Sequence, residues 1–351
     1  AVGKDAGLSV TTGVENTLIG ALAGDAITTA SNTTAVGKSA LGANTTGNNN
    51  TAVGYNAMDA ATTGIQNSAL GANALGALTT GNNNVGLGVG AGGGTTTGGS
   101  NIAIGISALA SNTTGGQNIA IGQDTLYYNT AEYNTAVGHN TMVANTSGTY
   151  NVAVGAFALD ANTTASNNTA VGYASLGANT SGTQNTALGA FALDANTTAA
   201  NNTALGFQAL TSTTTGAGNV AVGAGAMTLS TGQRNAVLGH LAMDAAGAGS
   251  YSVAIGYAAL STNTSGNFNV AIGDSALISN TTASNNVAIS YAALNVNTTG
   301  ANNVAIGYSA LAANTTASNN VAIGYAAMDA NTTGANNTAM GHAALGANTT
   351  G

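Results

Sequence analysis

The chain contains no proline, cysteine or tryptophan, and charged residues make up only 4% of its 351 residues. An ordinary soluble domain has about 25% charged residues. The lack of cysteine excludes disulfides and thiolate metal sites, and three bases (Lys4, Lys38 and Arg234) are too few for a nucleic-acid-binding surface. No apolar run approaches the ~18 residues that a membrane-spanning helix needs. We therefore expect contact with neither nucleic acid nor membrane within this sequence.

What the sequence does contain is a repeat. A glycine that follows an aliphatic residue recurs from Gly3 to Gly341, and Ser290 fills the single position where this glycine is missing. Every step is 17 residues, except for two steps of 16 that end at Gly138 and Gly239. Such self-similarity at a fixed period is typical of a solenoid in which each repeat forms one coil. The repeat leaves no room for a second domain, so residues 1–351 are predicted to be a single repeat array, an uncapped segment of a longer chain.

The residue types in each repeat predict β structure. Residues 303–319 are a regular copy, with Val304-Ala305-Ile306 before the corner Gly307 and with Asn314-Thr315-Thr316 after it. The aliphatic triplet is a short β-type segment, and Ala310-Leu311 is predicted to be a second extended stretch. Glycine permits a sharp corner, and Asn-Thr-Thr is turn chemistry. The fold class expected is all-β: a parallel β-solenoid, or β-roll, of about 20 coils with 17 residues per coil.

Stacking of identical coils predicts ladders of like residues. We expect the aliphatic residue before each corner glycine to line the core, facing a ladder of Leu or Met that lies four residues after the glycine. The asparagine four residues before each glycine is expected to form a ladder in which each side-chain amide bonds the next coil. A set of independent Asx turns is the alternative interpretation of this asparagine column.

The apolar triplet also predicts partner chains. Val304-Ala305-Ile306 and its equivalents do not alternate apolar and polar residues, so neither strand face is plainly solvated. A 17-residue coil encloses few side chains to offset the entropy of ordering its backbone. With small alanines on the second face, another chain can approach closely. We therefore predict self-association into a homo-oligomer, with a trimer favoured, or into a filament; the alternative is that alanine is simply tolerated at the surface.

Two sets of motifs resemble known families. Ser252–Gly256 and Asn269–Gly273 resemble the head repeat of YadA-like trimeric autotransporter adhesins. The unit Asn168–Tyr173, followed by Leu176 and by Asn179-Thr180, resembles the repeats of bacterial and phage tail-fibre-type proteins. The resemblance spans the full chain and implies a trimeric left-handed β-roll that projects a stalk, or that contacts a surface glycan or a host cell. It implies an extracellular, cell-surface or virion-fibre location. The adhesin heads use a coil several residues shorter, and the extra residues here enlarge the Asn-Thr-Thr loop.

Residues that resemble reactive groups have structural explanations, and we predict no catalytic, cofactor-binding or metal site. His139, His240 and His342 each follow the corner glycine, in a column that also holds Tyr55, Tyr173, Phe207, Tyr257, Tyr291, Tyr308 and Tyr325, and many coils separate them. Another column, just after the Leu or Met, holds Asp59, Asp160, Asp194, Asp244 and Asp329, of which no two lie in adjacent coils. The glycines in residues 90–94 lack the Lys-Ser/Thr and the helix of a phosphate-binding loop; they indicate a degenerate coil that has lost its core Leu at Gly92.

The function predicted is that of a structural fibre or adhesin segment, forming a rigid extracellular rod, filament or stalk. The alternative is an ice-binding or carbohydrate-binding solenoid that uses threonine or asparagine ladders, because nearly every coil carries a pair such as Thr281-Thr282. Adjacent threonines in an extended chain point to opposite sides, so only one of the two columns can face outward. A β-helical lyase needs clustered acids with Arg or Lys, and three bases across the chain do not supply them. We therefore predict that the chain is not an enzyme.

Overall fold

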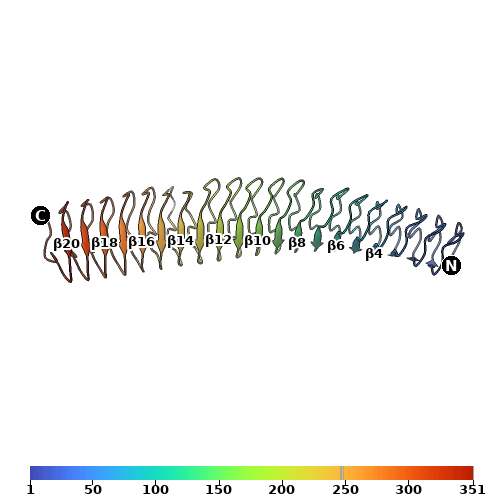
Figure 1. Ribbon diagram of the computed structural model, residues 1–351, viewed down its shortest axis with the longest axis horizontal. Helices are drawn as coiled ribbons and strands as arrows, with labels where there is room; N and C mark the ends of the chain where they lie inside the picture. Colours follow the sequence, from blue (N-terminus) through green and yellow to red (C-terminus); the bar gives the residue numbers. More distant parts are fainter. Residues whose placement is uncertain (246, 248, 351) are drawn as a thin grey trace. The chain divides into compact units, whose positions relative to one another are not determined.

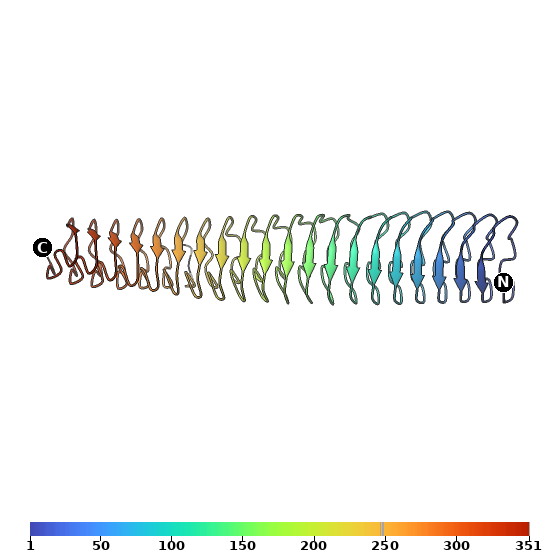
Figure 2. The same ribbon diagram turned by 60° about the horizontal axis from the view of Figure 1, so that its bottom comes forward.

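The chain folds into an all-β parallel solenoid of about 19–20 turns, with 17 residues per turn and no helix among the described residues. This computed structural model describes residues 1–245, 247 and 249–350. Contacts between residues group the chain into two units, Ala1–Ser181 and Gly182–Gly351. Each coil contributes one strand, and consecutive strands within a unit run in the same direction (Figures 1 and 2). The predicted fold class is thus confirmed.

In the first unit each strand pairs in register with the next, so that Thr34-Ala35-Val36 lies against Thr51-Ala52-Val53. Its strands are β1 (Thr17–Ile19), β2 (Thr34–Val36), β3 (Thr51–Val53), β4 (Ser68–Leu70), β5 (Val85–Leu87), β6 (Ile102–Ile104), β7 (Ile119–Ile121), β8 (Thr135–Val137), β9 (Val152–Val154) and β10 (Thr169–Val171). In-register parallel pairing stacks each column of the repeat on itself, which is why residue types recur so regularly at each position.

The second unit is built in the same way, with Val304-Ala305-Ile306 paired in register with Val321-Ala322-Ile323. Its strands are β11 (Thr186–Leu188), β12 (Thr203–Leu205), β13 (Val220–Val222), β14 (Ala236–Leu238), β15 (Val253–Ile255), β16 (Val270–Ile272), β17 (Val287–Ile289), β18 (Val304–Ile306), β19 (Val321–Ile323) and β20 (Thr338–Met340). The 16-residue step before Gly239 leaves the pairing of β13 with β14 in register.

The strand faces the opposite way from the prediction. In β18 the middle residue, Ala305, is fully buried, while Val304 and Ile306 point outward and are only half-buried. The expectation that the aliphatic residue before the corner lines the core, with alanine on the second face, is therefore wrong. The reason is the narrowness of a 17-residue coil. Its interior holds Leu311 and Ala310 from the far side, so only a methyl group fits on the strand side.

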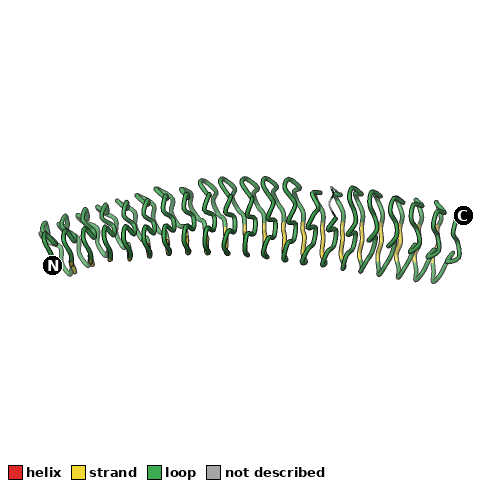
Figure 3. Tube along the Cα trace, turned by 180° about the vertical axis from the view of Figure 1, so that it is seen from behind, coloured by secondary structure: helices red, strands yellow, loops and turns green. Residues whose placement is uncertain are grey.

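Among the described residues, the far side of each coil is a run of turns without a second strand. Only the triplet before the corner is extended, and the rest of each coil is turn or loop (Figure 3). The predicted extended stretch Ala310-Leu311 is thus wrong: Ser309 and Leu311 have φ of 51° and 52°, in the left-handed region. Alternating left-handed residues coil the backbone tightly and direct the Leu or Met side chain inward. Leu311 and its equivalents in the Leu or Met column are fully buried or nearly so, as predicted, except Leu345 in the last coil, which is 50% exposed.

The corner glycine is required by a close backbone approach. Gly307 has φ of 132°, and a Cβ built on it would lie 2.4 Å from the carbonyl oxygen of Gly324 in the next coil. A side chain here is strained both sterically and by its backbone conformation. Ser290 occupies this corner with φ of 109°, so its backbone deviates from that of the glycines.

Irregular coils compensate for their missing core residues. Gly7 and Gly24 replace the usual Leu or Met, and Leu18 replaces the usual alanine between them. A Cβ on Gly7 or Gly24 would lie 2.7 or 2.8 Å from a methyl carbon of Leu18, so that one leucine fills both gaps. At Gly92 a Cβ would lie 2.7 Å from Leu75 Cδ2. The glycines of residues 90–94 thus belong to a degenerate coil, as predicted.

Two asparagine ladders run through each unit. In the first, four residues before the corner, the Asn67 side chain donates its Nδ2–H to Asn50 Oδ1 at 3.2 Å and to the Gly81 carbonyl at 3.0 Å. Asn67 Oδ1 in turn accepts from the backbone N–H of Asn84 at 2.9 Å. The amide ladder is therefore confirmed. A second ladder, seven residues after the corner, includes the bond from Asn314 Nδ2 to Asn297 Oδ1 at 2.9 Å.

Candidate interaction surfaces

The outward strand face is the main apolar surface in both units. It consists of the two columns of outward residues, one and three positions before each corner, and in every described strand these are Val, Ile, Leu, Met, Ala, Thr or Ser. Exposed fractions are 73% at Met340 in the last strand, 51% at Leu70, 46% at Leu188 and 41% at Leu205. None of these positions carries a charge. Because the strands stack in register, the column one position before the corner forms a continuous apolar strip along each unit, beside a column that mixes Thr or Ser with Val, Ile and Ala.

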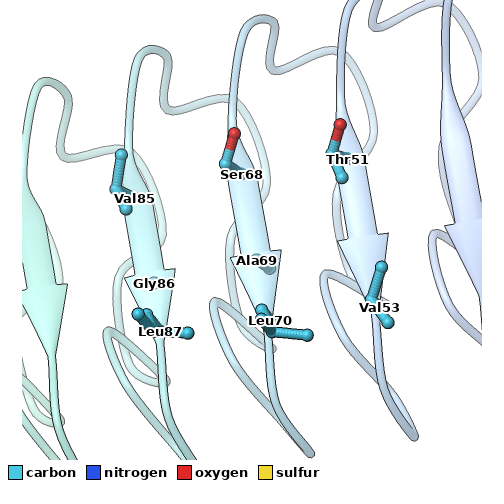
Figure 4. A pocket seen from close by; sticks show the side chains of 8 residues that line it. All are labelled: Thr51, Val53, Ser68, Ala69, Leu70, Val85, Gly86 and Leu87. Carbon is cyan, nitrogen blue, oxygen red and sulfur yellow. The ribbon is translucent and has the colours of Figure 1, made fainter.

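A shallow apolar groove lies on this face over β3, β4 and β5. Figure 4 shows Thr51 and Val53, Ser68 and Leu70, and Val85 and Leu87 in matching pairs on three neighbouring strands. Between each pair the strand shows only backbone or the inward Ala69, and in β5 the inward position is Gly86. The groove is thus a property of the paired columns: two rows of side chains with a backbone floor.

In the threonine pairs, one side chain bonds the neighbouring coil and the other faces solvent, as expected for adjacent residues that point to opposite sides. The first threonine of a pair is half-buried, and its hydroxyl donates to the carbonyl of the equivalent threonine in the next coil, as Thr45 does to Thr62 and Thr62 to Thr79 at 3.2 Å. The second threonine, for example Thr46 or Thr63, is exposed. Only one hydroxyl column therefore faces solvent, and the other strengthens contacts between coils.

The three histidines lie in the aromatic column that follows the corner. His342 stacks on Tyr325 with ring centroids 5.1 Å apart, and His240 stacks on Tyr257 at 5.8 Å. His139 meets the edge of Phe157 at 5.5 Å. In the second unit the stack continues from His342 through Tyr325 and Tyr308 to Tyr291. Each imidazole thus occupies the place of a phenol ring and packs as an aromatic group.

The aspartates of the column after the Leu or Met are separated, as the sequence predicted. Burial raises the pKa of Asp59, and it does the same for Asp194 and Asp244. For Asp59, hydrogen bonds from backbone N–H groups partly offset that rise. Within residues 1–245, 247 and 249–350, no group of three or more His, Cys, Asp or Glu side chains is arranged to hold a metal ion.

One polar feature escaped the sequence reasoning. Arg234, noted there only as one of three bases, lies over the ring of Tyr251 with its guanidinium carbon 5.6 Å from the ring centroid. Its Nη1–H donates to the Tyr251 hydroxyl at 3.3 Å, and both residues border a groove in the second unit. Its position in the repeat could have marked it, because Arg234 is the only basic residue in the column just before the first asparagine ladder.

Compared with models of protein families and with curated proteins, the chain matches none. Among the described residues there is also no helix long and apolar enough to cross a membrane. The resemblances to adhesin heads and tail fibres therefore stay predictions.

Proposed function

We propose that this chain is a structural fibre segment, a stiff solenoid that associates with further copies of itself through the outward strand face. The observation that carries the proposal is the combination of a largely hydrogen-bonded interior with a mainly apolar outer face. Buried polar side chains such as Asn67 and Asn314 are used up in bonds between and within coils. The outward columns, in contrast, carry no charge, and the column one position before the corner is apolar in every described strand.

The size of the face supports self-association. A strand of three residues is about 10 Å wide and stacked strands are about 4.8 Å apart, so ten strands offer roughly 480 Å². The face of one unit alone thus supplies more than half of the about 800 Å² per partner that a stable interface buries. A net charge of −8 works against association of identical chains, but the strand columns themselves contain no charged residue. Apolar strips without charge fit a second copy better than they fit water.

The finer parts of the proposal rest on the resemblance to adhesin and tail-fibre repeats. In this proposal the copies number three, and the rod is displayed outside the cell or on a virion, where it projects or carries a surface-contacting part. The chain has no catalytic role in it, since three bases cannot furnish the clustered groups of a lyase site. An ice-binding role finds less support, because half of the paired hydroxyls already donate to the neighbouring coil.

Thiol labelling tests the covered face, because the chain has no native cysteine. Three variants place a single cysteine within one coil: Ala204→Cys on the inward side of β12, Leu205→Cys on its outward side, and Thr215→Cys in the exposed loop. Leu205 is 41% exposed in the single chain. If a second copy covers the strand face, Leu205→Cys reacts with a maleimide much more slowly than Thr215→Cys.

The inward variant Ala204→Cys provides the fully protected reference, and all three thiols should react alike in denaturant. Equal reaction rates for Leu205→Cys and Thr215→Cys in the native protein would overturn the proposed interface. Mass measurement on the same samples shows whether the cysteine itself has changed the assembly.

A further inference from the structure

The second unit contains a groove at the edge of the strand face, over β13, β14 and β15. Its walls are the outward residues Val220, Ala236 and Val253 on one side, and Gly218, Arg234 and Tyr251 from the preceding turn on the other. Arg234 and Tyr251 lie outside the strand columns. The groove therefore shares Val220, Ala236 and Val253 with the face proposed for self-association, and its other wall lies outside that face.

The groove exists because two positions carry smaller residues than their columns usually hold. Ala236 is the only alanine in its outward column, where the other strands carry Thr, Ser, Val or Ile. Gly218 is the only glycine in the column five residues before the corner, the column that also holds Arg234 and Tyr251. A Cβ on Gly218 would lie 3.4 Å from Arg234 Cγ, so a larger residue would press on the arginine stem. The two small residues thus leave room both for Arg234 and for a ligand beside it.

Arg234 is held in a fixed orientation at this groove. It is the only arginine of the chain, and its guanidinium lies against the Tyr251 ring, with one N–H donating to the Tyr251 hydroxyl. Tyr251 in turn stacks on Phe268, with centroids 5.1 Å apart and planes 16° apart. A guanidinium has five N–H donors, so donors remain for an incoming group. Stacking on a ring orients the planar fork, which matches the two oxygens of a carboxylate.

The irregularities of the array coincide here. One of the two 16-residue steps lies between Gly223 and Gly239, within the stretch that forms the groove. In the same stretch Val237 replaces the inward alanine, and Ser252 replaces the first-ladder asparagine. A uniform structural rod has no need of such changes in adjacent coils. They are accounted for if these coils carry a site.

We propose that this groove binds a carboxylate-bearing sugar. The Arg234 guanidinium pairs with the carboxylate, and the sugar ring lies in the hollow over Ala236, against Val220, Val253 and the Tyr251 ring. The class follows from the combination of groups. A guanidinium alone takes any small anion, whereas the adjoining hollow, apolar with an aromatic border, favours a ligand with a ring of carbon-bound hydrogens next to its charge.

Two substitutions test the site without disturbing the coil. Arg234→Gln removes the charge, and glutamine already occupies the same left-handed turn position at Gln66, Gln117 and Gln184, with φ of 58–61°. Ala236→Val restores the residue found at the equivalent positions of β13 and β15 and fills the hollow. The matched control is Lys38→Gln, because the Lys38 amine also lies over an aromatic ring, 5.8 Å from the centroid of Tyr55.

Saturation-transfer difference NMR on the full chain uses three probes: the methyl glycosides of N-acetylneuraminic acid, glucuronic acid and glucose. We expect transfer to one or both acidic sugars and none to glucose. Arg234→Gln and Ala236→Val should each weaken binding at least tenfold, while Lys38→Gln leaves it unchanged. Absence of transfer to both acidic sugars, equal transfer to glucose, or undiminished binding by Arg234→Gln would overturn the proposal. So would displacement of the sugar by equimolar acetate or phosphate, because that result identifies a site for simple anions.

Discussion

Replacing Asn67 by alanine should open the solenoid locally. Asn67 is fully buried, and its Oδ1 accepts from the backbone N–H of Asn84 at 2.9 Å while its Nδ2 donates to the Gly81 carbonyl at 3.0 Å. Alanine leaves both of these backbone groups buried and without their partner. Each such group costs about 1–3 kcal/mol, so the free energy of local opening should fall by about 2–6 kcal/mol.

Native-state hydrogen exchange measures this loss directly. In a repeat array the coils interact mainly with their neighbours, so opening is local and a single global unfolding free energy is poorly defined. With about 1.4 kcal/mol per factor of ten, the lower limit of the estimate corresponds to roughly thirtyfold faster exchange at the Asn84 amide. Distant coils should exchange at their original rates.

Two variants calibrate the result. Asn67→Ser should lose less, because Ser252 occupies the same ladder and its Oγ accepts from the Asn269 N–H at 3.1 Å. Asn82→Ala removes an asparagine that also accepts a backbone N–H, from Ile65 at 2.8 Å, but at an exposed site where water can replace it. If Asn67→Ala accelerates exchange no more than Asn82→Ala does, the buried ladder does not stabilise the coil as argued.

Three further predictions concern the corner, the core and pH. Ser290→Gly should stabilise its coil by about 1–3 kcal/mol by relieving a backbone conformation that side chains avoid, and Gly307→Ser should do the reverse; local exchange rates that respond in the same direction for both would refute the strain. Leu18→Ala should cost about 2–5 kcal/mol and accelerate exchange in the coils of Gly7 and Gly24. Because burial raises the pKa of Asp59, the charged form is disfavoured in the fold. Asp59→Asn should therefore stabilise the chain at pH 7, and melting curves should lose that difference below the ordinary aspartate pKa of about 3.9.

The period and the ladders of this fold could be predicted from the sequence because they depend only on which residues recur. The corner at Gly307, the buried Leu311 and the Asn67 ladder all follow from columns that admit few residue types. In-register stacking converts a periodic sequence into a periodic structure without further information.

The direction of the strand could not be predicted from periodicity, because Val304-Ala305-Ile306 contains no polar residue to mark the outer face. Side-chain volume held the missing information: a column that is alanine in nearly every coil indicates a space that admits only a methyl group. The left-handed turns were missed because Leu and Met are unusual at positive φ. Gly7, Gly24 and Gly92 in that same column were the signal for it.

The groove at Arg234 was missed for a different reason. Gly218 and Arg234 occupy the same column of adjacent coils, and Ala236 lies in the outward strand column, so the three become neighbours only when adjacent coils are aligned. Alignment of the columns shows that each of the three departs from its own column. Irregular positions in a regular array thus deserve the same scrutiny as motifs in an irregular one.

The most direct test of the central claim, that the outward strand face joins copies of this chain, is the mass of the native protein by multi-angle light scattering at micromolar concentration. One chain has a mass of 33.4 kDa. The native mass should be a multiple of this value, with three copies expected, and it should fall toward that of a single chain when Leu188 and Leu205 are both replaced by lysine. A native mass of 33.4 kDa for the unaltered chain would contradict it.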